Sequence, residues 1–138
     1  MRLRLGLVFF VLGSAAAFAQ SRNAKVEFKN SPEISSPAVG YGGLLFVSGK
    51  ASYSAPDPKD IRSCVTYALD QVEAELKNAG SSMDKVLKVQ IFLRDINDYA
   101  AMNEIFAARF AKEPPTRTTV AAIIPRESLV EIDAVAFV

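Results

Sequence analysis

Apolar residues at helical spacing predict two amphipathic helices in this chain of 138 residues. In the first, the apolar side chains recur every three or four positions and share one side: Ile61, Val65, Ala68, Leu69, Val72 and Leu76. Asp57 followed by Pro58 predicts the helix start, because a carboxylate caps free N–H groups and proline fits the first helical position. Residues 78–80 predict its end. A second helix is predicted over residues 99–111, with a buried stripe and its border formed by Met102, Ile105, Phe106, Arg109 and Phe110.

Alternation of apolar and polar positions predicts strands in the first two thirds of the chain. Residues 38–41 and 44–48, separated by two glycines, are typical of a β-hairpin. Residues 25–28 alternate well enough for an edge strand. Residues 86–93 predict a strand with one apolar face, made by Leu87, Val89, Ile91 and Leu93.

Two more strands are predicted at the C-terminal end, residues 118–124 and 129–138, connected as a hairpin by residues 125–128. Apolar residues occupy both faces of the last strand, which is more than a sheet with one water-facing side would carry. The order of strands, helix, strand, helix and strands predicts an α+β fold in which two helices pack on one face of a mixed β-sheet.

The first nineteen residues have the layout of a secretory signal peptide. Arg2 and Arg4 precede a short apolar run, and Ala17-Phe18-Ala19 fits a small-residue cleavage site. The alternative is an N-terminal helix that is retained in the core. We expect cleavage after Ala19, a single domain over residues 20–138, and export to the periplasm or the medium without a membrane anchor.

Composition excludes several classes of function. The formal net charge is +1, so nucleic acid and anionic membranes are poor candidates for the main partner. The chain has no histidine, which excludes Ser-His and Cys-His nucleophile pairs and the usual histidine metal sites. Cys64 is the single cysteine, so no internal disulfide forms, and its place among apolar positions predicts a packing role.

Candidate chemistry lies near the C-terminal end. Arg117 follows two prolines and precedes an uncharged segment, 118–125. Glu131 and Asp133 lie two residues apart on a predicted strand, and they therefore share one face. A guanidinium that grips a carboxylate in bidentate fashion, near carboxylates on a neighbouring strand, predicts a site for a small carboxylate-bearing molecule.

Four segments carry a resemblance to a known family. They are Leu-Leu-Phe-Val-Ser-Gly at 44–49, Asp-Ile-Asn-Asp-Tyr followed by Met-Asn within 95–103, Pro-Pro-Thr-Arg-Thr-Thr-Val at 114–120, and Val-Glu-Ile-Asp-Ala at 130–134. Each is weakly specific alone, but their order and spacing make the set specific. Together they resemble the RidA family of reactive-intermediate deaminases, the YjgF-type proteins. The resemblance runs from about residue 36 to residue 137 and implies the chorismate-mutase-like α+β fold.

The resemblance also implies roles for particular residues. Arg117 matches the active-site arginine that binds the substrate carboxylate, and Glu131 matches the acid that orients the attacking water. Asn103 and Ser48 match substrate-binding positions, and Thr119 stands where many members carry cysteine. A further departure is Ala38, where deaminating members often carry tyrosine; Tyr41 is nearby but displaced along the strand. The departure at Ala38 puts the choice of substrate in question more than the reaction.

The implied reaction is hydrolysis of small 2-imino acids, formed from enamines such as 2-aminoacrylate, to a 2-keto acid and ammonia. It needs no metal and no organic cofactor. The family also implies a homotrimer with helices outside, sheets facing inward and three clefts between subunits, each near one Arg117.

Other interpretations remain open at this point. The chain could be a non-catalytic trimer that binds small carboxylates, or a protein-binding, holdase-like module; RNA cleavage ranks last because no basic patch is present. Arg117 and Glu131 could form structural contacts between subunits, Asn103 could lie on the surface, and Ser48 could only complete a turn. Asp133 is expected to be structural.

Overall fold

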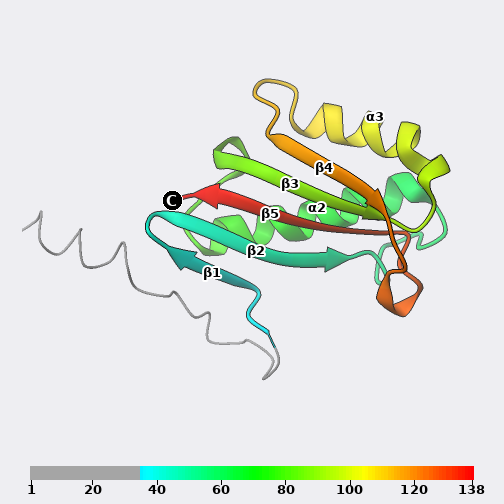
Figure 1. Ribbon diagram of the computed structural model, residues 1–138, viewed down its shortest axis with the longest axis horizontal. Helices are drawn as coiled ribbons and strands as arrows, with labels where there is room; N and C mark the ends of the chain where they lie inside the picture. The colour runs from blue at the N-terminus through cyan, green and yellow to red at the C-terminus, as the bar shows by residue number, and fades with distance from the viewer. Residues whose placement is uncertain (1–34) are drawn as a thin grey trace, which may run out of the picture.

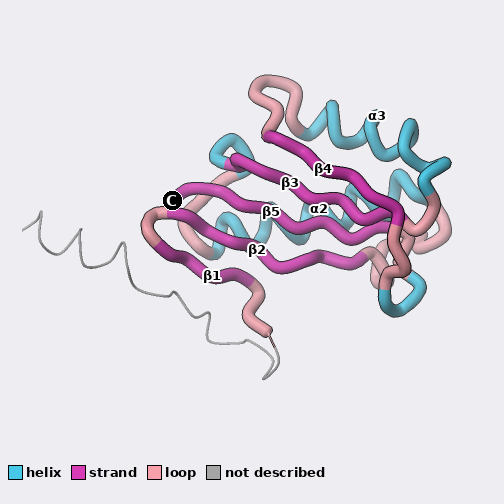
Figure 2. Tube along the Cα trace, in the orientation of Figure 1, coloured by secondary structure: helices cyan, strands magenta, loops and turns pink. Residues whose placement is uncertain are grey.

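The computed structural model of the protein describes residues 35–138. They form a five-stranded sheet with two α-helices on one face (Figures 1 and 2). In chain order the elements are β1 (Ala38–Tyr41), β2 (Leu44–Ala51), α2 (Ile61–Asn78), β3 (Val86–Leu93), α3 (Tyr99–Arg109), β4 (Thr116–Ala121) and β5 (Val130–Phe137). The α+β prediction is confirmed. The predicted signal peptide, its cleavage after Ala19 and the strand at 25–28 lie outside the described residues.

The sheet has the strand order β1-β2-β5-β3-β4. All neighbours are antiparallel except β3 and β4, which run parallel because α3 carries the chain from one to the other. The prediction that the last two strands form a hairpin is therefore wrong. The chain leaves β4 at the sheet edge, passes over β3 through the turn Pro125–Glu127, and inserts β5 between β2 and β3.

Helix α2 begins one turn later than the sequence predicts. Its N-cap is Asp60, whose carboxylate accepts a hydrogen bond from the backbone N–H of Ser63 at 2.8 Å. Asp57 instead accepts from the N–H of Lys59 at 3.0 Å, within the turn that contains Pro58. The proline therefore belongs to the lead-in turn, and the helix starts where the second carboxylate can reach a free N–H group.

The core lies between α2 and the covered face of the sheet. All six predicted apolar residues of α2 are buried, and so is Cys64, whose thiol pKa is raised by burial, as expected for packing. In β3 the prediction for Leu87 is wrong, because this side chain is 45% exposed. The pairing of β3 with β5 is irregular between Val86 and Lys88, and Val86 is buried there.

The opposite face of the sheet is covered by no element of residues 35–138. It carries large apolar side chains, among them Phe46 and Phe137, which are 46% and 42% exposed. Alternate residues of β5 point to this face and to the core, and the second half of the strand is apolar on both sides, as predicted for Val135 and Phe137. An exposed apolar surface of this kind is typical of an interface between chains.

Helix α3 packs at the β4 edge on the same face as α2 (Figure 1). It ends at Arg109, two residues before the predicted end, with Phe110 as its C-cap. The guanidinium of Arg109 pairs with Asp70 and, at 2.8 Å, with Glu73, both on α2. These ion pairs connect the two helices and fix α3 above β4.

Candidate functional site

The side chain of Arg117 lies beneath α3. Arg117 is the second residue of β4 and pairs with Val89 of β3, whose side chain points into the core, so both face the helices. Its Nη2 donates to the phenol oxygen of Tyr99 at 3.0 Å, and its Nη1 is 3.9 Å from the sulfur of Met102. The guanidinium carbon is 4.6 Å from the ring centroid of Phe106 and 5.5 Å from that of Tyr99. We call this surrounding the arginine niche.

The arginine niche contains a cation among neutral groups. No carboxylate within residues 35–138 forms an ion pair with Arg117, whereas Lys50, Arg62, Lys77 and Arg109 are all paired with acids. Aromatic faces stabilise a guanidinium without neutralising it. The half-buried Arg117 therefore keeps both its charge and several N–H donors for an anion that arrives from outside this part of the chain.

A second group of predicted residues gathers around Glu131. This residue is on β5 opposite Ala51, and its carboxylate lies against Gly49. A Cβ added at Gly49 would come within 2.9 Å of the Glu131 Cδ, so only glycine leaves room for the acid in this position. Glu131 and Asp133 share one face of β5, as predicted.

Ser48 lies beside this group, in an irregularity of β2 between Val47 and Lys50. Its hydroxyl donates to the carbonyl oxygen of Ser36 at 2.6 Å, and its N–H donates to that of Pro37 at 3.0 Å. The side chain thus anchors the segment that enters β1, and its oxygen retains acceptor capacity.

The two groups do not meet within one chain. Arg117, Val89 and Ala134 are aligned across the sheet and face the helices, whereas Val120, Phe92 and Glu131 are aligned on the uncovered face. Strand β3 separates Arg117 from Glu131. The prediction that Arg117 lies near carboxylates on a neighbouring strand is therefore wrong, and the reason is the place of β5 in the sheet.

Two further predicted residues lie on the elements of the arginine niche. Thr119 is two residues beyond Arg117 on β4, and so faces the same side. Its hydroxyl is buried and has no hydrogen-bond partner among the described residues. Asn103 follows Met102 on α3 and is half-buried. The Thr119 hydroxyl is therefore a polar group that a ligand could satisfy, and it lies on the same strand as Arg117, which has no carboxylate partner in the described part of the chain.

Neither Ala38 nor Tyr41 supplies a phenol at the position of the family tyrosine. Ala38 is fully buried in β1, and Tyr41 is 63% exposed at the tip of the β1–β2 hairpin. The phenol that does reach Arg117 belongs to Tyr99, which is part of the family segment within 95–103 and the first residue of the predicted second helix. The sequence contains no signal for this contact, because it depends on how α3 packs over β4.

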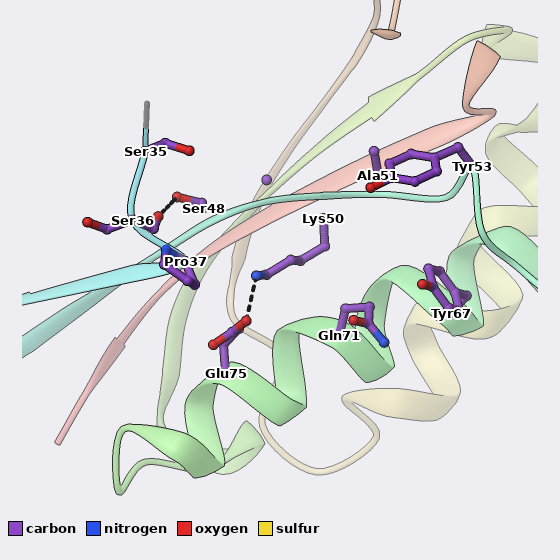
Figure 3. Close-up of a pocket in the computed structure, with 11 residues that line it drawn as sticks. Ser35, Ser36, Pro37, Ser48, Lys50, Ala51, Tyr53, Tyr67, Gln71 and Glu75 are labelled. Carbon is purple, nitrogen blue, oxygen red and sulfur yellow. Dashed lines mark hydrogen bonds and ion pairs between the residues drawn. The ribbon is translucent and has the colours of Figure 1, made fainter. Parts of the chain in front are cut away.

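A hollow of about 390 Å³ lies between the end of β2 and α2 (Figure 3). Ser48 lines it together with Lys50 and Glu75, whose charged groups pair across the gap at 2.8 Å. Spacing along α2 could have indicated this stripe, because Tyr67, Gln71 and Glu75 recur every four residues. The hollow is remote from Arg117, since β5 and β3 separate β2 from β4.

Asp133 lies on the uncovered face, paired with Gln90 of β3. Burial raises the pKa of its carboxyl, and the nearby Lys88 only partly offsets this effect.

No group of three or more metal-binding side chains of His, Cys, Asp or Glu occurs within residues 35–138. None of the helices in that part of the chain has the length and apolar character needed to cross a membrane.

Fold and site together define a class: a small α+β protein with a half-buried arginine that has no carboxylate partner within residues 35–138. Comparison with known proteins identifies the family. The sequence profile described as Endoribonuclease L-PSP matches residues 25–138. A RutC family protein of Pyrococcus horikoshii is 34% identical over 120 residues, which cover 79% of this chain and 93% of that protein. A protein of Escherichia coli K12 named "Putative reactive intermediate deaminase TdcF" is 29% identical over 121 residues, which cover 80% of this chain and 94% of that protein.

Solved structures agree with these matches. A YjgF family member from Neisseria meningitidis superposes with a TM-score of 0.76 at 33% identity, covering 84% of this chain and 96% of that one. The Rid family protein YyfA from Yersinia pestis gives a TM-score of 0.77 at 29% identity, covering 83% and 100%. The chain therefore belongs to the RidA family, also called the YjgF or L-PSP family, and the predicted resemblance is confirmed.

Proposed function

We propose that this protein is a hydrolytic deaminase of small 2-imino acids of the 2-iminopropanoate type, which form from enamines such as 2-aminoacrylate. The observation that carries the proposal is the arginine niche, in which Arg117 is held by neutral groups and has no carboxylate partner among residues 35–138. A guanidinium in this state suits the bidentate binding of a substrate carboxylate. Relatives named as reactive-intermediate deaminases support the same chemistry.

The reaction needs positioning and proton transfer only. Water adds its oxygen to the imine carbon, and Glu131 accepts a proton from that water as a general base. Glu131 returns this proton to the nitrogen, which gives the carbinolamine. The carboxylate then takes the hydroxyl proton of the carbinolamine and passes it to the nitrogen as the C–N bond breaks, so that the carbon–oxygen bond becomes the keto group, ammonia leaves and Glu131 is again a carboxylate. A positioned general base contributes about 10²–10⁴-fold in rate. Asn103, Thr119 and Ser48 would hydrogen-bond the substrate or the carbinolamine.

A homotrimer brings the separated residues together in this proposal. One chain cannot present Arg117 and Glu131 to a single small substrate, because they point to opposite faces of the sheet. The exposed apolar face around Phe46 and Phe137 supports assembly with the sheets turned inward. Each of three clefts would then combine Arg117 of one protomer with Glu131 of the next.

The site of action is part of the proposal. We infer export to the periplasm or the medium from the predicted signal peptide at residues 1–19, which leaves the domain 20–138. Cleavage is tested by expressing the full chain in a bacterial host and measuring the mass of the mature protein. A mass that retains the first nineteen residues would contradict export.

The experiment for the reaction generates the imine in place. An amino-acid oxidase acting on alanine supplies 2-iminopropanoate, and pyruvate release is followed with and without the protein. We expect the protein to accelerate pyruvate release, and Arg117→Ala to abolish the gain while light scattering still reports the wild-type assembly. Arg62→Ala, which removes a solvent-exposed ion pair with Glu104, is the matched control and should retain the rate.

Two other functions are outcomes of the same experiment. Equal rates with and without the protein, together with pyruvate binding that depends on Arg117, would indicate a non-catalytic carboxylate-binding module. The description Endoribonuclease L-PSP raises RNA cleavage, but a net charge of +1 offers little attraction for phosphates.

A further inference from the structure

Tyr99 lies in a fixed and accessible place beside Arg117. It is the first residue of α3 and follows the short turn Ile96–Asp98, whose start is capped by Asp95 through the N–H of Asn97 at 2.9 Å. The Tyr99 side chain is 42% exposed. The turn therefore fixes the backbone while the phenol remains open to a ligand.

The hydrogen bonds of the phenol leave its proton available. The oxygen of Tyr99 accepts from Arg117 Nη2 at 3.0 Å. A hydroxyl both accepts and donates, and arginine only donates, so the phenolic hydrogen must point away from the guanidinium. No acceptor for this hydrogen is found among residues 35–138.

The guanidinium has the same surplus of donors. Arginine carries five N–H groups. Within the described chain, one of them bonds to Tyr99, and Nη1 makes a long contact with the Met102 sulfur. The guanidinium carbon lies over the Phe106 ring, 4.6 Å from its centroid. A carboxylate binds arginine through its N–H groups, and those that remain are next to the phenol.

We propose that Tyr99 is a substrate-binding residue whose hydroxyl donates to the same carboxylate that Arg117 holds. A carboxylate accepts several hydrogen bonds, so a bidentate arginine leaves room for a third donor on one of its oxygens. The bond between Arg117 and Tyr99 fixes the three donors relative to one another before the ligand arrives. The ligand class, small 2-keto and 2-imino acids, rests on the proposed function.

Removal of one hydroxyl tests this role. Tyr99→Phe keeps the ring beside Arg117 and removes only the donor. We expect the dissociation constant for pyruvate, measured by titration calorimetry, to rise about tenfold, as for the loss of a hydrogen bond to a charged group. KM for the imino acid should rise by a similar factor and kcat should change less than twofold.

The matched control is Tyr53→Phe. Tyr53 is also half-exposed, and the Arg126 guanidinium lies 4.8 Å from its ring centroid. Unlike Tyr99, however, Tyr53 follows β2, which β5 and β3 separate from β4. Pyruvate affinity should be unchanged in this variant. Methyl pyruvate, which has no carboxylate charge, should bind wild type and Tyr99→Phe equally weakly.

The outcomes separate this inference from the proposed function. Tighter pyruvate binding by wild type than by Tyr99→Phe, in a wild type that does not deaminate, supports Tyr99 and contradicts the deaminase. Deamination with equal pyruvate affinities for the two proteins contradicts Tyr99 and supports the deaminase. A wild type that does not bind millimolar pyruvate, or a Tyr99→Phe effect confined to a lower melting temperature, overturns the inference.

Discussion

At the scale of single residues, Arg117 shows how residues 35–138 hold an arginine without pairing it with an acid. A phenol oxygen, a thioether and two aromatic faces contact its guanidinium. An acid in their place would satisfy the charge and close the site to anions. Sequence reasoning identified the residue from its isolation after two prolines, but the neutrality of its surroundings depends on α3, whose packing over β4 is not encoded locally.

Gly49 offers a test of the Glu131 position. Gly49→Ala places a methyl group within 2.9 Å of the Glu131 Cδ, and the flexible acid must move aside. We expect kcat for the imino acid to fall by roughly tenfold to a hundredfold, because a small displacement of a general base is costly. Steady-state kinetics measure the effect.

Stability distinguishes displacement from damage in this variant. The atoms in conflict are at the end of a side chain that can turn toward solvent, so the melting temperature should change by only a few degrees. Glu131→Gln in the Gly49→Ala background should add little further loss, because the acid is already misplaced. Full additivity of the two changes would contradict the displacement.

At the scale of elements, the spacing of apolar residues predicted those features that depend on residues close together in the chain. The buried stripe of α2, the bounds of β3 and the β1–β2 hairpin follow from side-chain spacing and two glycines. The order of strands does not, because insertion of β5 between β2 and β3 is chosen by long-range packing of a strand that is apolar on both faces. The exposure of Leu87 likewise depends on an irregular pairing that no alternation reveals.

The start of α2 gives a prediction at this scale. Asp60→Ala removes the carboxylate that accepts from the Ser63 N–H, and we expect a loss of about 1 kcal/mol in the free energy of unfolding. Denaturant titration measures this loss. Asp57→Ala is the matched control, since its carboxylate bonds only within the lead-in turn, and it should cost less. The reverse ranking would show that the sequence-based cap was right.

At the scale of the whole molecule, the uncovered face of the sheet is the main feature that a single chain does not explain. Phe46→Asp puts a charge in the middle of this face, where the side chain is 46% exposed in the protomer. We expect the variant to remain folded by circular dichroism and to elute as a monomer, with loss of deaminase activity, because burial of an unpaired charge opposes assembly.

A matched change elsewhere controls for the added charge. Ala74 is on the exposed side of α2, away from the sheet. The Ala74→Asp variant should therefore keep both the assembly and the activity of the wild type. A Phe46→Asp protein that keeps the wild-type mass and rate would remove the uncovered face from the proposed interface.

The division of Arg117 and Glu131 between the two faces of the sheet has a genetic consequence for the proposed trimer. In that assembly each protomer would contribute its cation to the cleft with one neighbour and its acid to the cleft with the other, so no protomer would contain a complete catalytic centre. Two alleles, one lacking the cation and one lacking the acid, would each give an inactive protein when expressed alone. Co-expressed, they would restore working centres wherever an intact cation meets an intact acid, as expected for complementation between alleles of one gene.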